Sequence, residues 1–314
     1  MVTVIVVGAG IAGLACARDL TAAGVPTRVL ERGRVVGGRL ASKRYDGRYA
    51  DIGAAYLTAD DPGFAGQLQS WRIAGLARPW TDTLRIFAGD GDGDGGGPAA
   101  ASAVGDGRTA RGPIRWAAPG GLRGLAENLA RGLDVTLEHE VTVLPDADAV
   151  VLAMPGPQAS RIAALEAAAA QRWAPALAAV LTYPDRDWAE FRGAFVNDHP
   201  VLATLCDDGD RRGDRAPVLV AHSTPQFAAR HLDDPAAAGQ AMAEAVSGLL
   251  RLGAPARTAV HRWTYATPEP AEGAYARHGR VYLAGDAYGK PRVQTAWLSG
   301  RAVAAAILRE RARS

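Results

Sequence analysis

The chain opens with a strand, a glycine-rich turn and a helix, and this order restricts its fold more than any other feature of the sequence. Val2–Val7 is an apolar, β-branched run, typical of a parallel strand buried on both faces. The turn occupies residues 8–13, residues 11–23 have the alanine-rich composition of a helix that ends near Gly24, and PTRVLE (26–31) is a second strand-like run. The sequence therefore predicts a β-α-β unit at its start.

The turn has the spacing of a dinucleotide-binding loop. Gly8, Gly10 and Gly13 form the pattern G-x-G-x-x-G, in which the first glycine allows a tight bend, the second lets a pyrophosphate approach the main chain, and the third lets helix and strand pack closely. The helix that follows offers free N–H groups and the positive end of its dipole. Glu31 ends the second strand, where a carboxylate can accept hydrogen bonds from ribose hydroxyls. These features together predict dinucleotide binding.

Two further segments favour a flavin over a nicotinamide. Gly37 and Gly38 allow a second close approach of the main chain, and Arg39 can reach a phosphate or the flavin edge. Near the other end of the chain, VYLAGDAYGKPRVQTAWLSG (281–300) predicts a strand, a turn at Gly285-Asp286 and a long helix that begins between Arg292 and Thr295. The acid can bind ribityl hydroxyls, and the helix dipole can stabilise negative charge on the reduced ring. One half-site from each end of the chain predicts FAD.

Composition excludes several classes of protein. The chain has 314 residues, is 48% hydrophobic and carries a formal net charge of +2, with no block of consecutive basic residues, so we expect no nucleic-acid partner. Its 2 cysteines, Cys16 and Cys206, do not suggest a disulfide framework and favour a reducing compartment. The start lacks the basic region of a signal peptide, and no apolar run is long enough for a membrane span. We therefore expect a cytoplasmic protein with no membrane partner.

The organisation of the chain predicts a discontinuous nucleotide domain. Residues 88–112 are rich in glycine and aspartate and are interpreted as a mobile surface loop. Within them, Asp90, Asp92 and Asp94 resemble the first half of a calcium loop, but Ala101 stands where the bidentate acid belongs. GLRGLAENLARGL predicts a helix; DVTLEHEVTVL, DAVVLAMP and PVLVAHS predict strands. Dinucleotide-type elements thus lie at both ends of the chain. We expect an FAD-binding domain over 1–55, 113–155 and 263–314, and a substrate domain over 56–112 and 156–262.

The chain resembles the FAD-dependent, amine-oxidase-like flavoproteins, and within them the bacterial renalase-like group. The segments that carry the resemblance, in family order, are VIVVGAGIAGLACARDL, LERGRVVGGRLASKR, YADIGAAYLTADDPGF, IRWAAPGGLRGLAENLA, DAVVLAMP, HRWTYATP and LAGDAYGKPRVQTAWLSGRAVAAAIL. The resemblance implies an α/β architecture of glutathione-reductase type, in which a discontinuous Rossmann-like FAD-binding domain carries an inserted α+β substrate domain with a mixed sheet. It also implies that FAD is bound non-covalently.

The activity implied by the resemblance is that of a renalase-like oxidase. Isomeric dihydropyridine forms of NAD(P)H would be oxidised to NAD(P)⁺ by hydride transfer to flavin N5, and dioxygen would accept the electrons as hydrogen peroxide. The alternatives are an amine oxidase, a flavin dehydrogenase that tailors a secondary metabolite, and a flavin-binding protein without catalytic activity. A nucleotide-sized donor would need a cationic entrance, which Arg44, Arg48 and Arg292 could supply.

The sequence departs from the family pattern close to the expected flavin ring. The usual Gly-Ala-Gln-Tyr is Gly53-Ala54-Ala55-Tyr56, the usual Gly-Asp-Trp ends in Ala287, and Gln294-Thr295 replace Glu-Gly. Candidates for contact with FAD are Gly8, Gly10, Ile11, Ala12, Gly13, Glu31, Arg32, Gly38, Arg39, Gly53, Ala54, Val141, Gly285, Asp286, Arg292, Val293 and Gln294.

Candidates for the substrate pocket come from aromatic residues and one histidine. Tyr56, Trp263, Tyr288 and Trp297 could line a pocket over the flavin, each with simple core packing as the alternative. His261 could hydrogen-bond the substrate or lie at a domain boundary, and Lys290 is compared with the lysine that anchors a water in amine oxidases. We take Tyr56, His261 and Trp297 as the substrate-pocket candidates. No His/Cys pattern has metal-ligand spacing, so no catalytic metal is expected.

Overall fold

The predicted β-α-β unit forms the start of the molecule. The computed structural model describes residues 3–88, 108–188 and 190–313, except for the side chain of residue 88. β1 (Val4–Val7) leads through the glycine-rich turn into α1 (Ile11–Ala22), and β2 (Thr27–Leu30) returns beside β1. The two strands pair in parallel, with Val4 opposite Thr27. This part of the sequence analysis is confirmed to within a few residues at each end.

A six-stranded sheet grows from this unit, and strands from distant parts of the chain complete it. Its order is β14-β15-β8-β1-β2-β7. β8 is buried along its whole length and pairs in parallel with β1, as expected for a central strand. The added strands are β7 (Asp134–Thr136), β8 (Ala149–Leu152), β14 (Ala276–His278) and β15 (Val281–Leu283).

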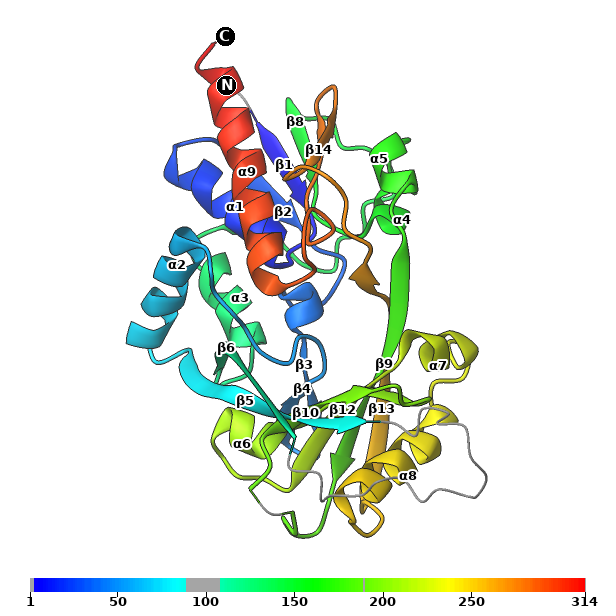
Figure 1. The fold of residues 1–314 in the computed structure, drawn as a ribbon. Coiled ribbons are helices and arrows are strands. Elements are labelled where there is room, and N and C mark those ends of the chain that lie inside the picture. Colours follow the sequence, from blue (N-terminus) through cyan, green and yellow to red (C-terminus); the bar gives the residue numbers. More distant parts are fainter. Residues whose placement is uncertain (1–2, 89–107, 189, 314) are drawn as a thin grey trace.

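Helices cover both faces of this sheet (Figure 1). One face packs against α1, α3 (Arg123–Ala130) and α9 (Val293–Arg311), and the other against the short helices α4 (Gly156–Ala159) and α5 (Glu166–Ala169). α9 crosses α1 at very short range, because a Cβ atom on Gly300 would lie 2.0 Å from the carbonyl oxygen of Ala12. This crossing fixes where α9 begins relative to the glycine-rich turn.

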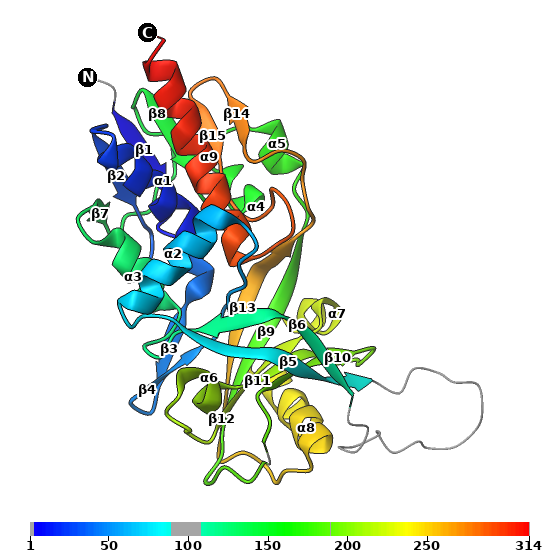
Figure 2. The ribbon, with the colours of Figure 1, turned by 60° about the vertical axis from the view of Figure 1, so that its left-hand side comes forward.

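A second, mixed sheet of seven strands forms the other end of the molecule, in the order β13-β9-β12-β11-β10-β5-β6 (Figures 1 and 2). α7 (Pro225–Arg230) and α8 (Ala238–Leu250) pack on this sheet through a separate apolar core. Its strands are β5 (Arg78–Ala88), β6 (Thr109–Ala117), β9 (Trp173–Thr182), β10 (Gly193–Asn197), β11 (Leu202–Asp207), β12 (Val218–Ser223) and β13 (Arg257–Pro268). Figure 2 shows β9 and β13 extending from this sheet toward the first one.

Smaller elements complete the molecule. The 3₁₀ helix η1 (Gly38–Leu40) leads into the hairpin β3 (Ser42–Tyr45) and β4 (Arg48–Asp51). α2 (Pro62–Ile73) follows, with Asp61 accepting a capping hydrogen bond from the N–H of Phe64 at 2.9 Å. α6 (Asp208–Arg212) lies at the end of β11. The segment from η1 to α2 carries the chain from the phosphate loop to the second sheet, whereas α6 connects two strands of that sheet, β11 and β12.

Two sequence-based expectations are corrected. DVTLEHEVTVL forms a strand only over β7, because Glu138 adopts a left-handed conformation (φ 54°) and its N–H bonds to the carbonyl of Gly33 at 3.0 Å. The predicted loop 88–112 is shorter than expected, since residues 109–112 belong to β6 and pair with β5. Residue 88 ends β5, and residues 89–107, with the calcium-like aspartates, lie outside the described residues. Across residues 3–88, 108–188 and 190–313, no helix is both long and apolar enough to cross a membrane.

The predicted limits of the two domains remain a proposal. Two strands of the seven-stranded sheet run across them: β6 continues past the limit at residue 113, and β13 passes the limit at residue 263. Both strands pair along their length with other strands of that sheet. A division by sheets would therefore assign residues 113–117 and 263–268 to the second unit.

Candidate cofactor and substrate site

The three glycines of the turn are required for different reasons. Gly8 has a φ of 106°, and a Cβ atom there would lie 2.7 Å from the carbonyl oxygen of Ala153. On Gly13 a Cβ would lie 2.0 Å from the carbonyl oxygen of Gly8. A Cβ on Gly10 would meet no atom within 4 Å, so Gly10 faces open space at the start of α1. The main chain is thus accessible at the point where a pyrophosphate would approach the helix terminus, which fits a dinucleotide.

Glu31 joins two loops of this cradle. Its Oε2 accepts a hydrogen bond from the N–H of Ala9 at 2.7 Å, and its Oε1 accepts one from Gly33 at 2.6 Å. Each carboxylate oxygen keeps a further lone pair for a ribose hydroxyl. Arg32, by contrast, is exposed and lies 3.8 Å from Glu140, and Val141 packs at the edge of the core beneath α4 and α5. Of these predicted cofactor residues, Glu31 has the geometry best suited to the adenosine ribose.

The second glycine pair packs directly on the first loop. Gly37 and Gly38 both have positive φ angles, 120° and 52°. The N–H of Gly37 donates to the carbonyl of Ala9 at 2.8 Å, and a Cβ on Gly38 would lie 3.3 Å from the Cα of Gly10. The predicted close approach therefore exists, and it places η1 against the phosphate loop.

Arg39 and Asp286 bring the two ends of the chain together. The guanidinium makes two hydrogen bonds to the carboxylate, of which Nη1 to Oδ2 measures 2.7 Å, and Nη1 also donates to the carbonyl of Ala266 at 3.1 Å. Asp286 is buried, and the N–H of Gly285 before it donates to Oγ of Ser299 on α9 at 3.0 Å. The guanidinium also lies 4.8 Å from the ring centroid of Trp173. The sequence predicted both residues as flavin ligands but did not predict that they pair.

At the start of α9, two side chains that were predicted to contact the cofactor make hydrogen bonds to Asp60. Arg292 makes two hydrogen bonds of 2.7 Å to the carboxylate of Asp60. Gln294 is buried, and its Oε1 accepts the N–H of Asp60 at 2.9 Å. These side chains attach α9 to the loop before α2, and their contact with FAD stays a prediction. The helix begins at Val293 without a capping side chain, so its main-chain N–H groups are what it can offer to a flavin.

Residues 51–56, expected beside the flavin ring, are held by side chains from the second sheet and its helix. Arg211 of α6 donates to the carbonyls of Asp51 and Ala55, each at 2.9 Å. Trp263 of β13 donates from its indole Nε1 to the carbonyl of Ile52 at 2.8 Å, and Nε2 of His222 lies 3.3 Å from the same oxygen. Trp263 therefore positions this segment. Gly53 is needed here because a Cβ atom would lie 1.9 Å from the carbonyl oxygen of Arg39.

A buried cluster of charges stands behind the same segment. Arg211 is fully buried and pairs with the equally buried Asp208 at 2.6 Å, and Arg48 reaches the other oxygen of Asp208 at 2.6 Å. Burial opposes the charge of Arg211, but the carboxylates of Asp208 and Asp51 outweigh it and raise its pKa. Arg48 and Arg292 are thus both bound in ion pairs, which argues against the cationic entrance expected from them. The sequence around α6, DDGDRRGD, resembles a solvated surface and gave no sign of this cluster.

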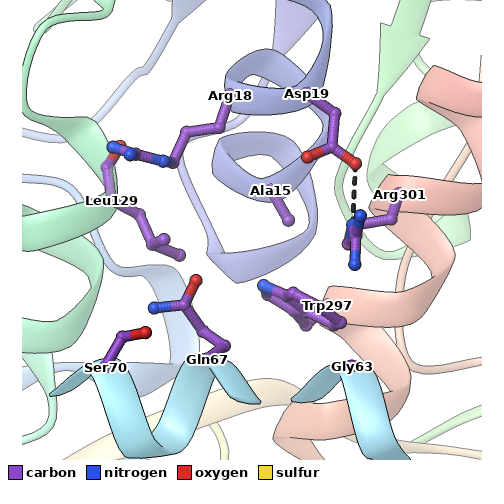
Figure 3. A pocket seen from close by; sticks show the side chains of 9 residues that line it. All are labelled: Ala15, Arg18, Asp19, Gly63, Gln67, Ser70, Leu129, Trp297 and Arg301. Atoms are coloured by element: carbon purple, nitrogen blue, oxygen red, sulfur yellow. Dashed lines mark hydrogen bonds and ion pairs between the residues drawn. The ribbon is translucent and has the colours of Figure 1, made fainter. Parts of the chain in front are cut away.

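The four candidate aromatic residues do not form one pocket, and this expectation is corrected. Trp297 is buried in the helical core with its ring centroid 5.5 Å from that of Phe64. It lines a cavity of about 240 Å³ between α1, α2, α3 and α9, where Arg301 lies over its ring and pairs with Asp19 (Figure 3). Tyr288 packs on the opposite face of the six-stranded sheet. Trp297 and Tyr56 therefore belong to different packed clusters.

Tyr56 lies in a separate group with an unexpected neighbour. Its ring centroid is 6.3 Å from that of Trp80, and the guanidinium carbon of Arg115 lies 5.3 Å from the Tyr56 centroid. Arg115 is 5% exposed, and its Nε and Nη1 have no hydrogen-bond partner. The sequence alone does not single out Arg115, because one arginine in a strand does not reveal what covers it.

The remaining candidates have clear positions. His261 lies on β13 opposite Ala178, with its ring 4.7 Å from that of Trp263, and burial together with Lys43 and Arg262 lowers its pKa. It is therefore neutral at pH 7. Lys290 is exposed. Cys16 and Cys206 are buried thiols, and no three His, Cys, Asp or Glu side chains gather as a metal site in the part of the chain that the structure describes.

Comparisons with known proteins agree with this architecture. Residues 125–308 match the family model of flavin-containing amine oxidoreductases, and residues 6–71 match that of an NAD(P)-binding Rossmann-like domain. A putrescine oxidase of Kocuria rosea is 51% identical over 57 residues, which are 18% of this chain and only 12% of that protein.

Solved structures with the same fold extend over the whole chain. The "Putative protoporphyrinogen oxidase" of Exiguobacterium sp. 255-15 superposes with a TM-score of 0.76 and 15% identity, over 98% of this chain and 99% of that one. Cyclohexylamine oxidase of Brevibacterium oxydans IH-35A gives 0.75 and 16% identity over the same shares. These likenesses confirm the predicted α/β fold with a Rossmann-like dinucleotide-binding domain.

Proposed function

The chain belongs to the family of flavin-containing amine oxidoreductases, and from this premise we propose that this FAD-dependent enzyme oxidises a small dihydropyridine donor, with dioxygen as the electron acceptor. In this renalase-like reaction a C–H bond of the donor breaks, the hydrogen leaves with both bonding electrons, and the ring nitrogen lone pair forms the new C=N bond. The transferred hydride, together with one proton from solvent, reduces dioxygen to hydrogen peroxide. The bound FAD supplies the ring system that accepts the electron pair and passes it on.

The residues of the chain hold the cofactor and orient the donor. We assign the phosphates to the loops around Gly10 and Gly38, the adenosine ribose to Glu31, and the ribityl chain to the turn at Asp286 beside Arg39. The free main-chain N–H groups at Val293 give a positive helix terminus, which can stabilise negative charge that develops on the flavin side of the site. Residues 51–56 are held rigidly enough by Arg211 and Trp263 to serve as a wall against water.

The side chains around Tyr56 favour a dihydropyridine over an alkylamine as the donor. Its apolar neighbours are Trp80, Leu84, Ala117, Phe195 and Cys206, and the guanidinium of Arg115 lies 5.3 Å from its ring centroid. The carboxylate bonded to this group, that of Asp210, already accepts the indole N–H of Trp80 at 2.6 Å. Burial raises the pKa of the Cys206 thiol to about 11. A dihydropyridine fits such a site, because its nitrogen lone pair drives hydride loss without prior removal of a proton. An alkylamine is an ammonium ion at neutral pH, and Arg115 would repel it.

An amine donor is the second candidate. The family match and the putrescine oxidase relative favour it. Both donors lose a hydride from a carbon conjugated with or attached to nitrogen, so the same flavin site could serve either.

Turnover of a donor panel separates the two candidates. We expect 2- and 6-dihydronicotinamide dinucleotides to generate peroxide faster than putrescine or benzylamine. Tyr56→Ala should slow this turnover while FAD stays bound, and Tyr49→Ala, which removes an exposed tyrosine on β4, should leave it unchanged. Efficient turnover of the amines with none of the dihydropyridines would replace the first candidate by the second.

A further inference from the structure

Arg115 is buried without the hydrogen-bond partners that a structural arginine normally has. It lies on β6 and is 5% exposed, yet its Nε and Nη1 have no hydrogen-bond partner. A charged group taken out of water without a counter-ion costs stability, and buried charges are therefore normally paired. Arg211, the other buried arginine among the described residues, follows this rule by pairing with Asp208.

The partners that Arg115 does have are aromatic rings. Its guanidinium carbon lies 5.3 Å from the ring centroid of Tyr56 and 5.7 Å from that of Phe195. Such contacts favour the cation but leave its in-plane N–H donors unused. Both rings are partly exposed, so the guanidinium lies one aromatic layer beneath the accessible surface.

The nearby carboxylates are already engaged. Asp208 is bound by Arg211 and Arg48, and Asp210 accepts the indole N–H of Trp80 at 2.6 Å. The Cys206 thiol stays protonated at neutral pH, because burial raises its pKa to about 11. The described side chains around Arg115 therefore provide it with no anion.

We propose that Arg115 is the substrate-recognition residue of the site at Tyr56, where its guanidinium binds an oxyanion, a carboxylate or a phosphate, of the donor. This inference rests on the proposed function, because it takes Tyr56 as part of the donor pocket. The donor class becomes an acidic C–N compound: a dihydropyridine or an amine that carries a carboxylate or phosphate group. A guanidinium matches such a group with two parallel hydrogen bonds. The aromatic rings of Tyr56 and Phe195 would enclose the flat part of the same molecule.

The test measures binding of inert probes to the purified holoprotein by isothermal titration calorimetry. Benzoate carries a carboxylate, phenyl phosphate carries a phosphate, and benzamide is a neutral molecule of the shape of benzoate. We expect one or both anions to bind at least about tenfold more tightly than benzamide, and whichever binds more tightly identifies the oxyanion. Arg115→Met should lower the affinity for that anion by about ten- to a hundredfold and leave the affinity for benzamide unchanged. Arg115→Lys should recover part of the affinity.

A matched control lies on the same strand. Arg111→Met makes the same substitution at a side chain that is 84% exposed and pairs with Asp82, and it should leave anion binding unchanged. Equal affinity of the wild-type protein for benzamide and for both anions would overturn the proposal, as would undiminished anion binding by a folded Arg115→Met protein. If Arg115→Met does not fold, Arg115→Lys and the wild-type preference decide.

Binding of these probes requires no turnover, so the result is separate from the proposed reaction. A protein that binds benzoate through Arg115 but oxidises no dihydropyridine would contradict the proposed donor and keep the anion site. A protein that oxidises dihydropyridines but shows no anion preference would support the proposed donor and contradict the anion site.

Discussion

At the scale of single residues, Glu31 shapes the cofactor cradle as well as offering lone pairs to a ligand. Its two oxygens fix the N–H groups of Ala9 and Gly33, so the carboxylate orders two loops before any ribose arrives. Removal of the side chain should therefore affect both the ligand contact and the loop geometry.

We expect Glu31→Ala to lower the affinity for FAD by about ten- to a hundredfold, the range for loss of a charge-assisted hydrogen bond. The measurement is the FAD content of the purified protein after extended dialysis. Glu272→Ala, at an exposed position, serves as the control and should retain its FAD. Full retention by the Glu31 variant would show that the ribose is bound elsewhere.

Arg39 and Asp286 should behave as one unit, because they are bound to each other as well as adjacent to the expected ribityl chain. Arg39→Met and Asp286→Asn should each weaken FAD binding by about tenfold or more. The double variant should bind FAD only slightly less tightly than the single variant with the lower affinity, because each single change already breaks the ion pair. FAD dissociation constants of the four proteins give the coupling; effects that simply multiply would mean that the two residues act independently.

Sequence reasoning at this scale succeeds for residues whose role is local. The spacing of Gly8, Gly10 and Gly13 follows from the turn itself and can be read without knowledge of the rest of the fold. The roles of Arg115 and Arg211 depend on what distant strands and helices place over them. Neither the strand sequence around Arg115 nor the charged run around Arg211 contains that information.

At the scale of elements, the crossing of α9 over α1 positions the C-terminal half-site. Gly300 permits this crossing, since a Cβ atom there would lie 2.0 Å from the main-chain oxygen of Ala12. The sequence predicts both helices from their apolar residues. It does not predict where they touch, because a helical glycine looks the same whether it faces another helix or solvent.

We expect Gly300→Ala to destabilise the protein by about 1–3 kcal/mol, because the added methyl group forces the helices apart. This loss should appear although alanine is the better helix former by about 1 kcal/mol. Gly248→Ala in α8 is the matched control: a Cβ there meets nothing within 4 Å, and the variant should be as stable as the wild type or slightly more so. Urea unfolding compares the three, and equal stability of the two variants would contradict the packing account.

At the scale of the whole molecule, residues 51–56 connect the six-stranded sheet with the seven-stranded one. His222 contributes from β12, with Nδ1 3.4 Å from Oγ1 of Thr204 and Nε2 3.3 Å from the carbonyl of Ile52. Burial lowers its pKa from 6.5 to about 4, with Arg211 adding to the effect. The folded protein therefore resists protonation of a side chain that lies between its two halves.

This pKa predicts acid sensitivity in a defined window. Above pH 6.5 His222 is neutral in the folded and the unfolded chain, so its contribution to stability is complete. As the pH falls from about 6.5 to about 4, the unfolded chain binds a proton that the folded chain does not, and up to about 3 kcal/mol of unfolding free energy is lost. His222→Gln should flatten the dependence of the unfolding free energy on pH within this window, whereas His278→Gln, at an exposed position, should not. Identical profiles for all three proteins would refute the assignment.

The sequence predicts the discontinuity of the molecule but not how its halves are joined. Motifs at 8–13 and 285–286 indicate that both ends of the chain serve one cofactor, and the structure brings Arg39 and Asp286 together. The joining contacts come from β12, β13 and α6, whose pairing partners are distant in sequence. For the same reason the separation of Trp297 from Tyr56 could not be foreseen, because it depends on which face α9 turns toward α1 and α2.

The most direct test of the proposed chemistry is a single turnover in one cuvette. Holoprotein is mixed without oxygen with an equimolar 2- or 6-dihydronicotinamide dinucleotide while the flavin absorbance is followed, and air is then admitted. The account predicts that the yellow colour bleaches, returns on exposure to air, and leaves about one hydrogen peroxide for each donor oxidised. A flavin that stays oxidised with both isomers, but bleaches with a simple amine, would contradict it.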